Sequence, residues 1–271
     1  MRAPRRADYL AANESKSVAQ PKLAVALSPF DLLPVTFYVN YGRGVSSQDV
    51  RGIARDPHGP KVATTDFYQA GVSYNSRRVS AVFSSFLIDR SNEQVYIPDD
   101  GSIELAGRSR SYGVEGRTTV AIGRYTSFNA GLTRVIRAFY PGRLTADGRR
   151  VAVDGAPHLV ANAGLVVSVF RGSAASLNWR HISAYRLDGE DASIRASGLD
   201  VVDLAISKKI TRRVKVSFAI DDLLNKRYYE TQNYFESRAC PTCDPVTRVH
   251  ATPGYPLTVT AGVTILFGKK N

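Results

Sequence analysis

Apolar and polar residues alternate along most of the chain. In the segment 257–267 one face carries the apolar set Leu257, Val259, Ala261, Val263, Ile265 and Phe267, and the other carries mainly threonine. A period of two residues is typical of a β-strand whose two faces meet different surroundings. Such stretches recur eleven times, at 21–28, 34–41, 66–74, 79–88, 109–120, 125–137, 157–169, 174–185, 198–208, 214–221 and 257–267.

The connections between these stretches alternate between short and long. The short ones are 29–33, 75–78, 121–124, 171–173 and 210–213, and the long ones are 43–65, 89–108, 138–156, 186–197 and 223–252. Outer-membrane barrels combine tight periplasmic turns with longer outer loops in this way. The sequence therefore predicts an all-β fold, an antiparallel up-and-down transmembrane β-barrel segment of about 11 strands.

Composition and charge narrow the class. Apolar residues make up 44% of the chain, and mean hydropathy is -0.18. No run of about 18 apolar residues exists, which excludes a helical membrane protein but not a barrel, whose strands show only alternate side chains to lipid. The net charge of +12 comes from 36 Lys and Arg against 24 Asp and Glu. Because the basic residues are scattered singly, we expect a polar lining and polar loops rather than a nucleic-acid binder.

Both ends of the chain suggest part of a larger barrel. The first ten residues, MRAPRRADYL, are basic but lack the apolar core of a signal peptide. Single-chain bacterial barrels have even strand numbers, whereas eleven is odd. We therefore expect residues 1–19 to be a poorly ordered remnant of an outer loop, 20–267 to be the barrel segment and 268–271 to be a periplasmic tail. Half of a wall, taken alone, should form an open curved sheet.

Three motifs resemble those of TonB-dependent outer-membrane receptors. They are the run IDDLLNKRYYE at 220–230, the ending TPGYPLTVTAGVTILF at 252–267 and the stretch NYGRGVS at 40–46. The motif residues expected to be structural are Asn225, Lys226, Tyr228, Tyr229, Pro253, Gly254, Tyr255, Pro256 and Phe267. The prolines cannot donate ladder hydrogen bonds and should stand where a strand begins. The three tyrosines should lie at the outer lipid interface.

The resemblance implies a function. Members of this family lie in the cell outer membrane and take up a scarce ligand, such as a ferric siderophore or cobalamin, with energy supplied through TonB. The plug and the remaining strands have no counterpart in this chain, so TonB would be reached only through the missing part. The resemblance implies no catalysis, cofactor, metal or nucleic acid. A passive porin-like barrel is the alternative, and a soluble secreted β-protein is a more distant one.

Two further groups of residues have more than one interpretation. Cys240 and Cys243 lie in the longest connection, and a local disulfide is expected over a zinc site, which would need two more ligands, or free thiols. Arg180 shares a polar face with Asn178, and Arg137 is expected on the opposite face from Arg134. Arg137, Arg180 and Asn178 could contact an anionic ligand in the lumen. We favour the alternative that they belong to a water-lined wall whose charges balance one another.

Overall fold

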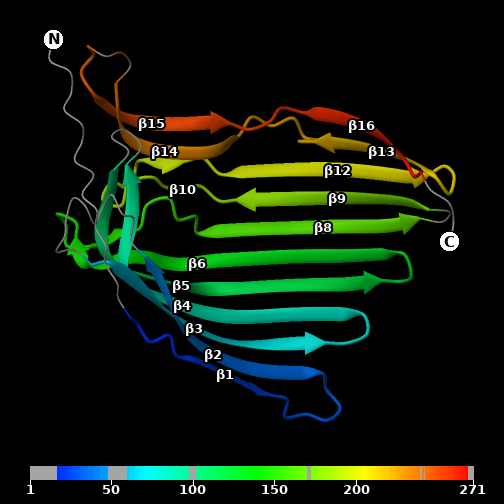
Figure 1. The fold of residues 1–271 in the computed structure, drawn as a ribbon, viewed down its shortest axis with the longest axis horizontal. Helices are drawn as coiled ribbons and strands as arrows, with labels where there is room; N and C mark the ends of the chain where they lie inside the picture. The colour runs from blue at the N-terminus through cyan, green and yellow to red at the C-terminus, as the bar shows by residue number, and fades with distance from the viewer. Residues whose placement is uncertain are drawn as a thin grey trace.

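Eleven strands of one sheet follow one another in chain order (Figure 1). The computed structural model describes residues 17–47, 60–97, 102–169, 172–238, 240 and 242–267. The strands are β1 (Lys22–Leu27), β2 (Val35–Ser47), β3 (Val62–Asn75), β4 (Val79–Ile97), β5 (Ser102–Ile122), β6 (Thr126–Leu144), β7 (Arg150–Ala152), β8 (Leu159–Val169), β9 (Ser173–Ile182), β10 (Tyr185–Arg186), β11 (Arg195–Ala196), β12 (Leu199–Lys209), β13 (Val214–Asp221), β14 (Tyr229–Ser237), β15 (Val246–Pro253) and β16 (Thr258–Ile265).

The sheet is an antiparallel meander that does not close. Its order is β1-β2-β3-β4-β5-β6-β8-β9-β12-β13-β16, with β7 added beside β6. Two separate hairpins, β10–β11 and β14–β15, stand in the connections before β12 and β16. No helix occurs in the described ranges, and none there is long and apolar enough to cross a bilayer. The predicted all-β, up-and-down, open arrangement is confirmed.

Several connections expected to be loops are strands. The segment 89–108 was expected to be a long loop, but β4 and β5 stay paired as far as Ile97 and Ser102. Likewise, β2 continues to Ser47 and β6 to Leu144. The alternation that marks a membrane strand is lost there because both faces of a strand beyond the bilayer meet water. Cross-strand ion pairs stabilise this part of the ladder, because the Arg108 and Arg110 guanidiniums both contact the Asp89 carboxylate.

Cross-strand register sorts the side chains onto two faces. One row pairs Leu177 with Leu204, Leu204 with Ile220, and Ile220 with Val259. The row beside it pairs Asn178 with Asp203 and belongs to the opposite face. We call the first the apolar face and the second the polar face. The predicted alternation of β8, β9, β12, β13 and β16 therefore produces one apolar and one polar surface, as a barrel wall requires.

The buried apolar residues lie mostly near the long-loop end. They are Ala63, Phe139, Tyr140, Val151, Leu187, Ala196, Val201 and Tyr228, whereas Val39, Phe83, Leu132, Val259 and Val263 on the apolar face remain exposed. A water-soluble domain of this size would bury such a face. The apolar face is thus suited to contact with lipid.

The predicted outer tail, residues 1–19, lies outside the described residues except for 17–19, which have no regular structure. The predicted periplasmic tail, residues 268–271, lies outside them completely.

Candidate functional site

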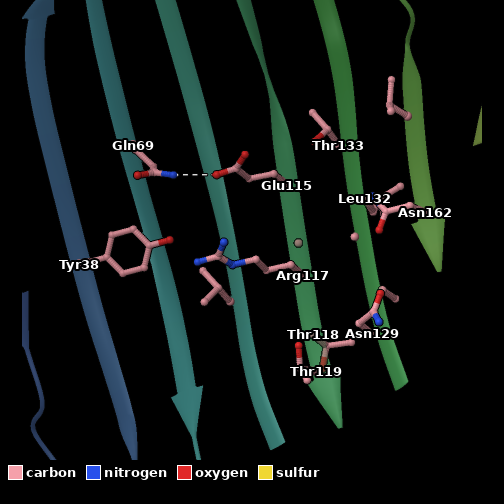
Figure 2. Close-up of a pocket in the computed structure, with 15 residues that line it drawn as sticks. Tyr38, Gln69, Glu115, Arg117, Thr118, Thr119, Asn129, Leu132, Thr133 and Asn162 are labelled. Atoms are coloured by element: carbon pink, nitrogen blue, oxygen red, sulfur yellow. Dashed lines mark hydrogen bonds between the residues drawn. The ribbon is translucent and has the colours of Figure 1, made fainter. Parts of the chain in front are cut away.

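A hydrogen-bond network joins three neighbouring strands on the polar face. Gln69 on β3 donates from Nε2 to Glu115 Oε1 on β5, at 2.8 Å, and to Ser84 Oγ on β4, at 3.2 Å. Ser84 donates in turn to Glu115 Oε1 at 3.0 Å and is fully buried. Figure 2 shows the bond between Gln69 and Glu115 spanning the intervening strand. Because each partner comes from a different strand, the network holds the wall together from its polar side.

Glycines allow large polar side chains to lie flat on this face. Tyr38 crosses the position of Gly71, where an added β-carbon would come within 2.6 Å of the tyrosine hydroxyl. The side chains of Asn129 and Asn178 flank Gly164, within 2.9 Å of where its β-carbon would be. A side chain at either glycine would displace these groups. A hollow of about 730 Å³ lies on the same strands.

The hollow is lined mainly by uncharged hydrogen-bonding groups. Its polar lining consists of Tyr38, Gln69, Glu115, Arg117, Thr118, Thr119, Asn129, Thr133 and Asn162, which Figure 2 shows on adjacent strands. Arg117 is exposed and forms no ion pair in the described part of the chain. Such a surface offers donors and acceptors to a polar ligand or to another protein surface. No histidine or cysteine is among the lining residues described, so a nucleophile with an imidazole base is not assembled there.

Two of the three predicted lumen residues lie on the polar face, at the border of this hollow. Arg180 pairs with Val201 in the register, and its Nε lies 3.7 Å from Asp203 Oδ2. Asn178 lies beside Gly164, as described above. Both come from β9, and the hollow extends toward them through Asn162, which pairs with Arg180.

Arg137 lies elsewhere. A bulge between Tyr112 and Gly113 leaves β6 with one extra residue, so that Arg134 pairs with Val114 and Arg137 pairs with Tyr112. Partners in register share a face, and Tyr112 and Val114 are two residues apart on β5. The bulge therefore places Arg137 on the same side as Arg134, not on the opposite side as expected from alternation alone. We leave Arg137 out of the candidate site.

The residues of the 220–230 motif form a tight corner after β13. Asp222 and Asn225 have left-handed backbone angles, with φ of 49° and 48°. The Asn225 N–H donates to the Asp222 carbonyl at 2.8 Å, and the Lys226 N–H lies 3.3 Å from Asp222 Oδ1. Asp222 is buried, and its own N–H donates to Asp203 Oδ1 at 3.0 Å. Asparagine and aspartate tolerate this conformation better than other non-glycine side chains, which explains the asparagine at position 225.

The second motif packs against the first. Tyr228 is buried, its ring lies over Gly254, and its hydroxyl donates to Glu230 Oε1 at 3.1 Å. The sequence predicts that the Tyr228 ring lies at the lipid headgroup level. The structure instead buries this ring against Gly254. Tyr255 is 75% exposed and Phe267 is 91% exposed.

The two prolines differ from each other in position. Pro256 stands before β16, as expected, whereas Pro253 ends β15, where it pairs with Tyr229. The two motifs therefore build one joint, at which the outer hairpin β14–β15 meets the wall.

The two cysteines are joined in a disulfide between Cys240 and Cys243. The bond lies in the connection between β14 and β15. In the described residues no group of three or more His, Cys, Asp or Glu side chains is arranged to hold a metal ion. The hairpin carries its own packing, since the Phe235 and His250 rings stack at 4.0 Å between centroids.

Polar pairs on the apolar face mark the outer limit of the lipid-facing surface. The Tyr41 and Tyr68 rings lie 5.0 Å apart, and Arg43 above them forms a two-point ion pair with Asp66. On the other half of the sheet, Asp200 accepts hydrogen bonds from Trp179 at 3.0 Å and from His181 at 2.9 Å. Rings with polar groups belong at the headgroup level of a bilayer.

Acidic groups at the long-loop end are matched with donors. Asp191, in the connection between β10 and β11, accepts from the Ser193 hydroxyl at 2.7 Å and from the Ser193 N–H at 2.8 Å. These donors lower the pKa of Asp191. Asp147 similarly accepts from Arg149 Nε at 2.6 Å. Asp191 and Asp147 are therefore locally satisfied, whereas burial raises the pKa of Asp154 at the same end.

Sequence reasoning missed the centre of the polar site. Gln69, Ser84, Glu115 and Arg117 have the polar parity of their three strands, but many other positions of these strands share that parity. The missing signal was the register, because only register brings residues 69, 84 and 115 side by side.

The sequence of this wall resembles a known protein family. The sequence profile of the family described as TonB dependent receptor-like, beta-barrel matches residues 4–223. None of the curated proteins matches the chain.

Solved structures share the fold. The ferric yersiniabactin uptake receptor FyuA from Yersinia pestis superposes with a TM-score of 0.69 at 17% identity, over 91% of this chain and 37% of that one. The copper transporter OprC gives a TM-score of 0.67 at 19% identity, over 90% and 38%. The ferric citrate transporter FecA, unliganded, gives 0.66 at 17% identity, over 90% and 38%. The chain thus spans well under half the length of these proteins.

Proposed function

The chain belongs to the TonB dependent receptor-like β-barrel family, and we propose that it forms part of the wall of an outer-membrane receptor that actively takes up a scarce ligand. The named structural relatives handle ferric yersiniabactin, copper and ferric citrate. By the same chemistry, the ligand here would be a ferric siderophore, cobalamin or a similar scarce compound. The function is binding and transport rather than catalysis.

The observation that carries this proposal is the combination of two faces on an open meander. The apolar face is suited to lipid, and the polar face holds the hollow around Gln69 and Glu115. In a closed barrel this polar face would line the lumen. Arg180 and Asn178 would then contribute to the same lining, either toward the ligand or toward a plug inside the barrel.

The open edges require additional strands. An open sheet cannot span a bilayer, because each unsatisfied backbone group in hydrocarbon costs several kcal/mol. The two edge strands, β1 and β16, run in the same direction, since ten antiparallel pairings separate them. Antiparallel closure therefore needs an odd number of further strands, which brings the total to an even number. We propose that these strands, the plug and the contact with TonB come from another part of the receptor.

The test is ligand uptake in cells that lack their own receptors. The full chain would be exported behind a signal peptide, alone or together with a plug and the complementary strands of a relative. Growth on a panel of ferric siderophores, ferric citrate and cobalamin would be measured, with and without TonB. We expect TonB-dependent uptake only when the complement is present.

Each other outcome has a meaning. Uptake by the chain alone would contradict its role as part of a wall. Uptake that persists without TonB would favour the passive porin-like alternative. No uptake of any compound by a complemented barrel that folds, as judged by heat-modifiable migration on gels, would count against a receptor.

A further inference from the structure

The positive charge of the described residues is concentrated at one end of the sheet. The described segments at the short-turn end are 28–34, 75–79, 121–126, 172–173, 208–215 and 265–267. Together they hold eight Lys and Arg and a single acidic residue, Asp31. They therefore account for seven of the nine net positive charges of the described residues. The remaining described residues, which include the polar face and the long-loop end, are close to neutral.

The densest part is the turn between β12 and β13. Lys208, Lys209, Arg212, Arg213 and Lys215 are all exposed there, and we call these five residues the basic rim. None of the ion pairs in the described residues involves the basic rim. Other short turns at the same end of the sheet carry Arg77, Arg78 and Arg124, which are likewise exposed.

The opposite end differs in its balance of charge. At the long-loop end, some arginines pair with carboxylates, as in Arg43 with Asp66 and Arg143 with Glu190. A set of charges that only solvated the protein would need no such difference between the two ends. The basic rim has no acidic neighbour inside the described chain, so its cations are available to bind an external anion.

The basic rim borders the lipid-facing surface. Lys208 pairs with Val216, and Val216 pairs with Val263, so the stem of Lys208 belongs to the apolar face. Ile206, one step further into the sheet, is exposed on that face. A lysine in this position can lay its methylene chain along apolar surface and place its ammonium at the headgroup level. Arg212 and Arg213 lie in the turn itself, just beyond it.

Within the basic rim, Lys209 and Lys215 pair with each other on the polar face. We propose that the other three residues, Lys208, Arg212 and Arg213, bind the phosphate of anionic phospholipid headgroups, with the lipid tails lying along Ile206, Val216 and Val263. The proposal rests on the proposed function, in that the apolar face must meet a bilayer. Guanidinium and ammonium groups both recognise phosphate, and arginine does so with two parallel hydrogen bonds. A basic side chain near an anionic membrane surface strengthens binding by on the order of fivefold. Several of them in one turn should select anionic over zwitterionic lipid.

The experiment measures lipid preference of the full chain in detergent micelles. Dodecyl maltoside micelles would carry either phosphatidylglycerol or phosphatidylcholine, and the phospholipid that co-elutes with the protein would be quantified. We expect at least a tenfold preference for phosphatidylglycerol at low salt, decreasing as salt screens the charges. The threefold variant Lys208→Ser, Arg212→Ser and Arg213→Ser should lose this preference.

A matched control separates position from net charge. Arg195→Ser, Arg227→Ser and Arg248→Ser remove three exposed arginines from the long-loop end, so both variants have a formal charge of +9 in place of +12. We expect this control to keep the preference. Lys208→Arg should also keep it, which guards against a misfolded threefold variant, and circular dichroism would verify the β-sheet content of each protein.

Three outcomes would overturn the proposal: no preference in the unmodified chain, full preference in the rim variant, or an equal loss in the control. Lipid selection in micelles requires neither a closed barrel nor ligand uptake. Failure of this proposal and failure of the proposed transport function can therefore be told apart.

Discussion

The ring of Tyr228 lies so close over Gly254 that a β-carbon on the glycine would come within 2.3 Å of it. The contact joins the chain leaving β13 to the chain entering β16, and the Gly254 N–H adds a hydrogen bond of 2.9 Å to the Tyr228 carbonyl. Gly254→Ala should therefore displace a buried ring and destabilise the joint by about 1–3 kcal/mol. Faster hydrogen exchange of the β14–β15 amides would report it.

The control for this prediction is Gly142→Ala on β6, where an added β-carbon meets nothing within 4 Å. Combining Gly254→Ala with Tyr228→Leu should recover part of the loss, because the smaller side chain leaves room for the methyl group. Unchanged exchange in Gly254→Ala would show that the ring moves aside freely.

The face assignment predicts opposite tolerance at neighbouring positions of β12. Leu204 lies on the apolar face midway between Asp200 and Lys208, whereas Ala205 pairs with Ser176 on the polar face. In a barrel completed with the complementary strands and placed in lipid bicelles, Leu204→Arg should cost about 2–4 kcal/mol and Ala205→Arg much less. Urea unfolding followed by circular dichroism gives both values. Equal costs would mean that the two faces are not distinguished by lipid.

The Gln69–Glu115 bond predicts energetic coupling across a strand. Hydrogen bonds to a charged group contribute about 1.5–3 kcal/mol, and these two side chains meet at 2.8 Å over Ser84. A double-mutant cycle with Gln69→Ala and Glu115→Ala should give a coupling of at least about 1 kcal/mol. Asn75→Ala with Glu115→Ala is a non-contacting control for additivity. A coupling near zero in the first cycle would remove the network as a stabilising element.

The parallel direction of the two edge strands predicts that two copies do not close into one barrel. A second copy in the same membrane orientation could join β16 to β1 only as a parallel pair. Chains with Ala24→Cys and Thr260→Cys should therefore give no cross-linked dimer on non-reducing gels. As a positive control, Ala24→Cys with Asn40→Cys should cross-link within one chain, because these residues are partners in register. A high yield of dimer from the first pair would contradict this topology.

Sequence alone was sufficient where one surface of a strand is dry and the other wet. Val259 and Val263 on β16 alternate with threonine and glycine neighbours because lipid would select one side. The same reasoning failed beyond the bilayer, where residues 89–97 carry no such contrast although they form a ladder. Cross-strand ion pairs between Asp89 and two arginines stabilise that part, and a pair of this kind cannot be recognised without the register.

The candidate site was predicted only at its border, through Arg180 and Asn178. A one-residue bulge on β6 moved Arg137 to the other side, and no local sequence signal marks that insertion. The centre of the site depends on glycines opposite large polar groups, such as Gly71 under Tyr38. Glycine in a strand is visible in a sequence. The side chain that covers the glycine, however, is determined by the register between the paired strands.

The length of the β4–β5 ladder has an immunological consequence. β4 contains 19 residues, which at about 3.4 Å each extend roughly 65 Å, whereas a tilted crossing of the hydrocarbon needs only about 9–11 residues. In the proposed receptor, the outer part of this hairpin would therefore be held in backbone hydrogen bonds at the cell surface. Antibodies raised against a flexible peptide of this segment would meet a different shape on the folded protein. Antibodies that recognise the intact cell would bind an epitope formed by two adjacent strands.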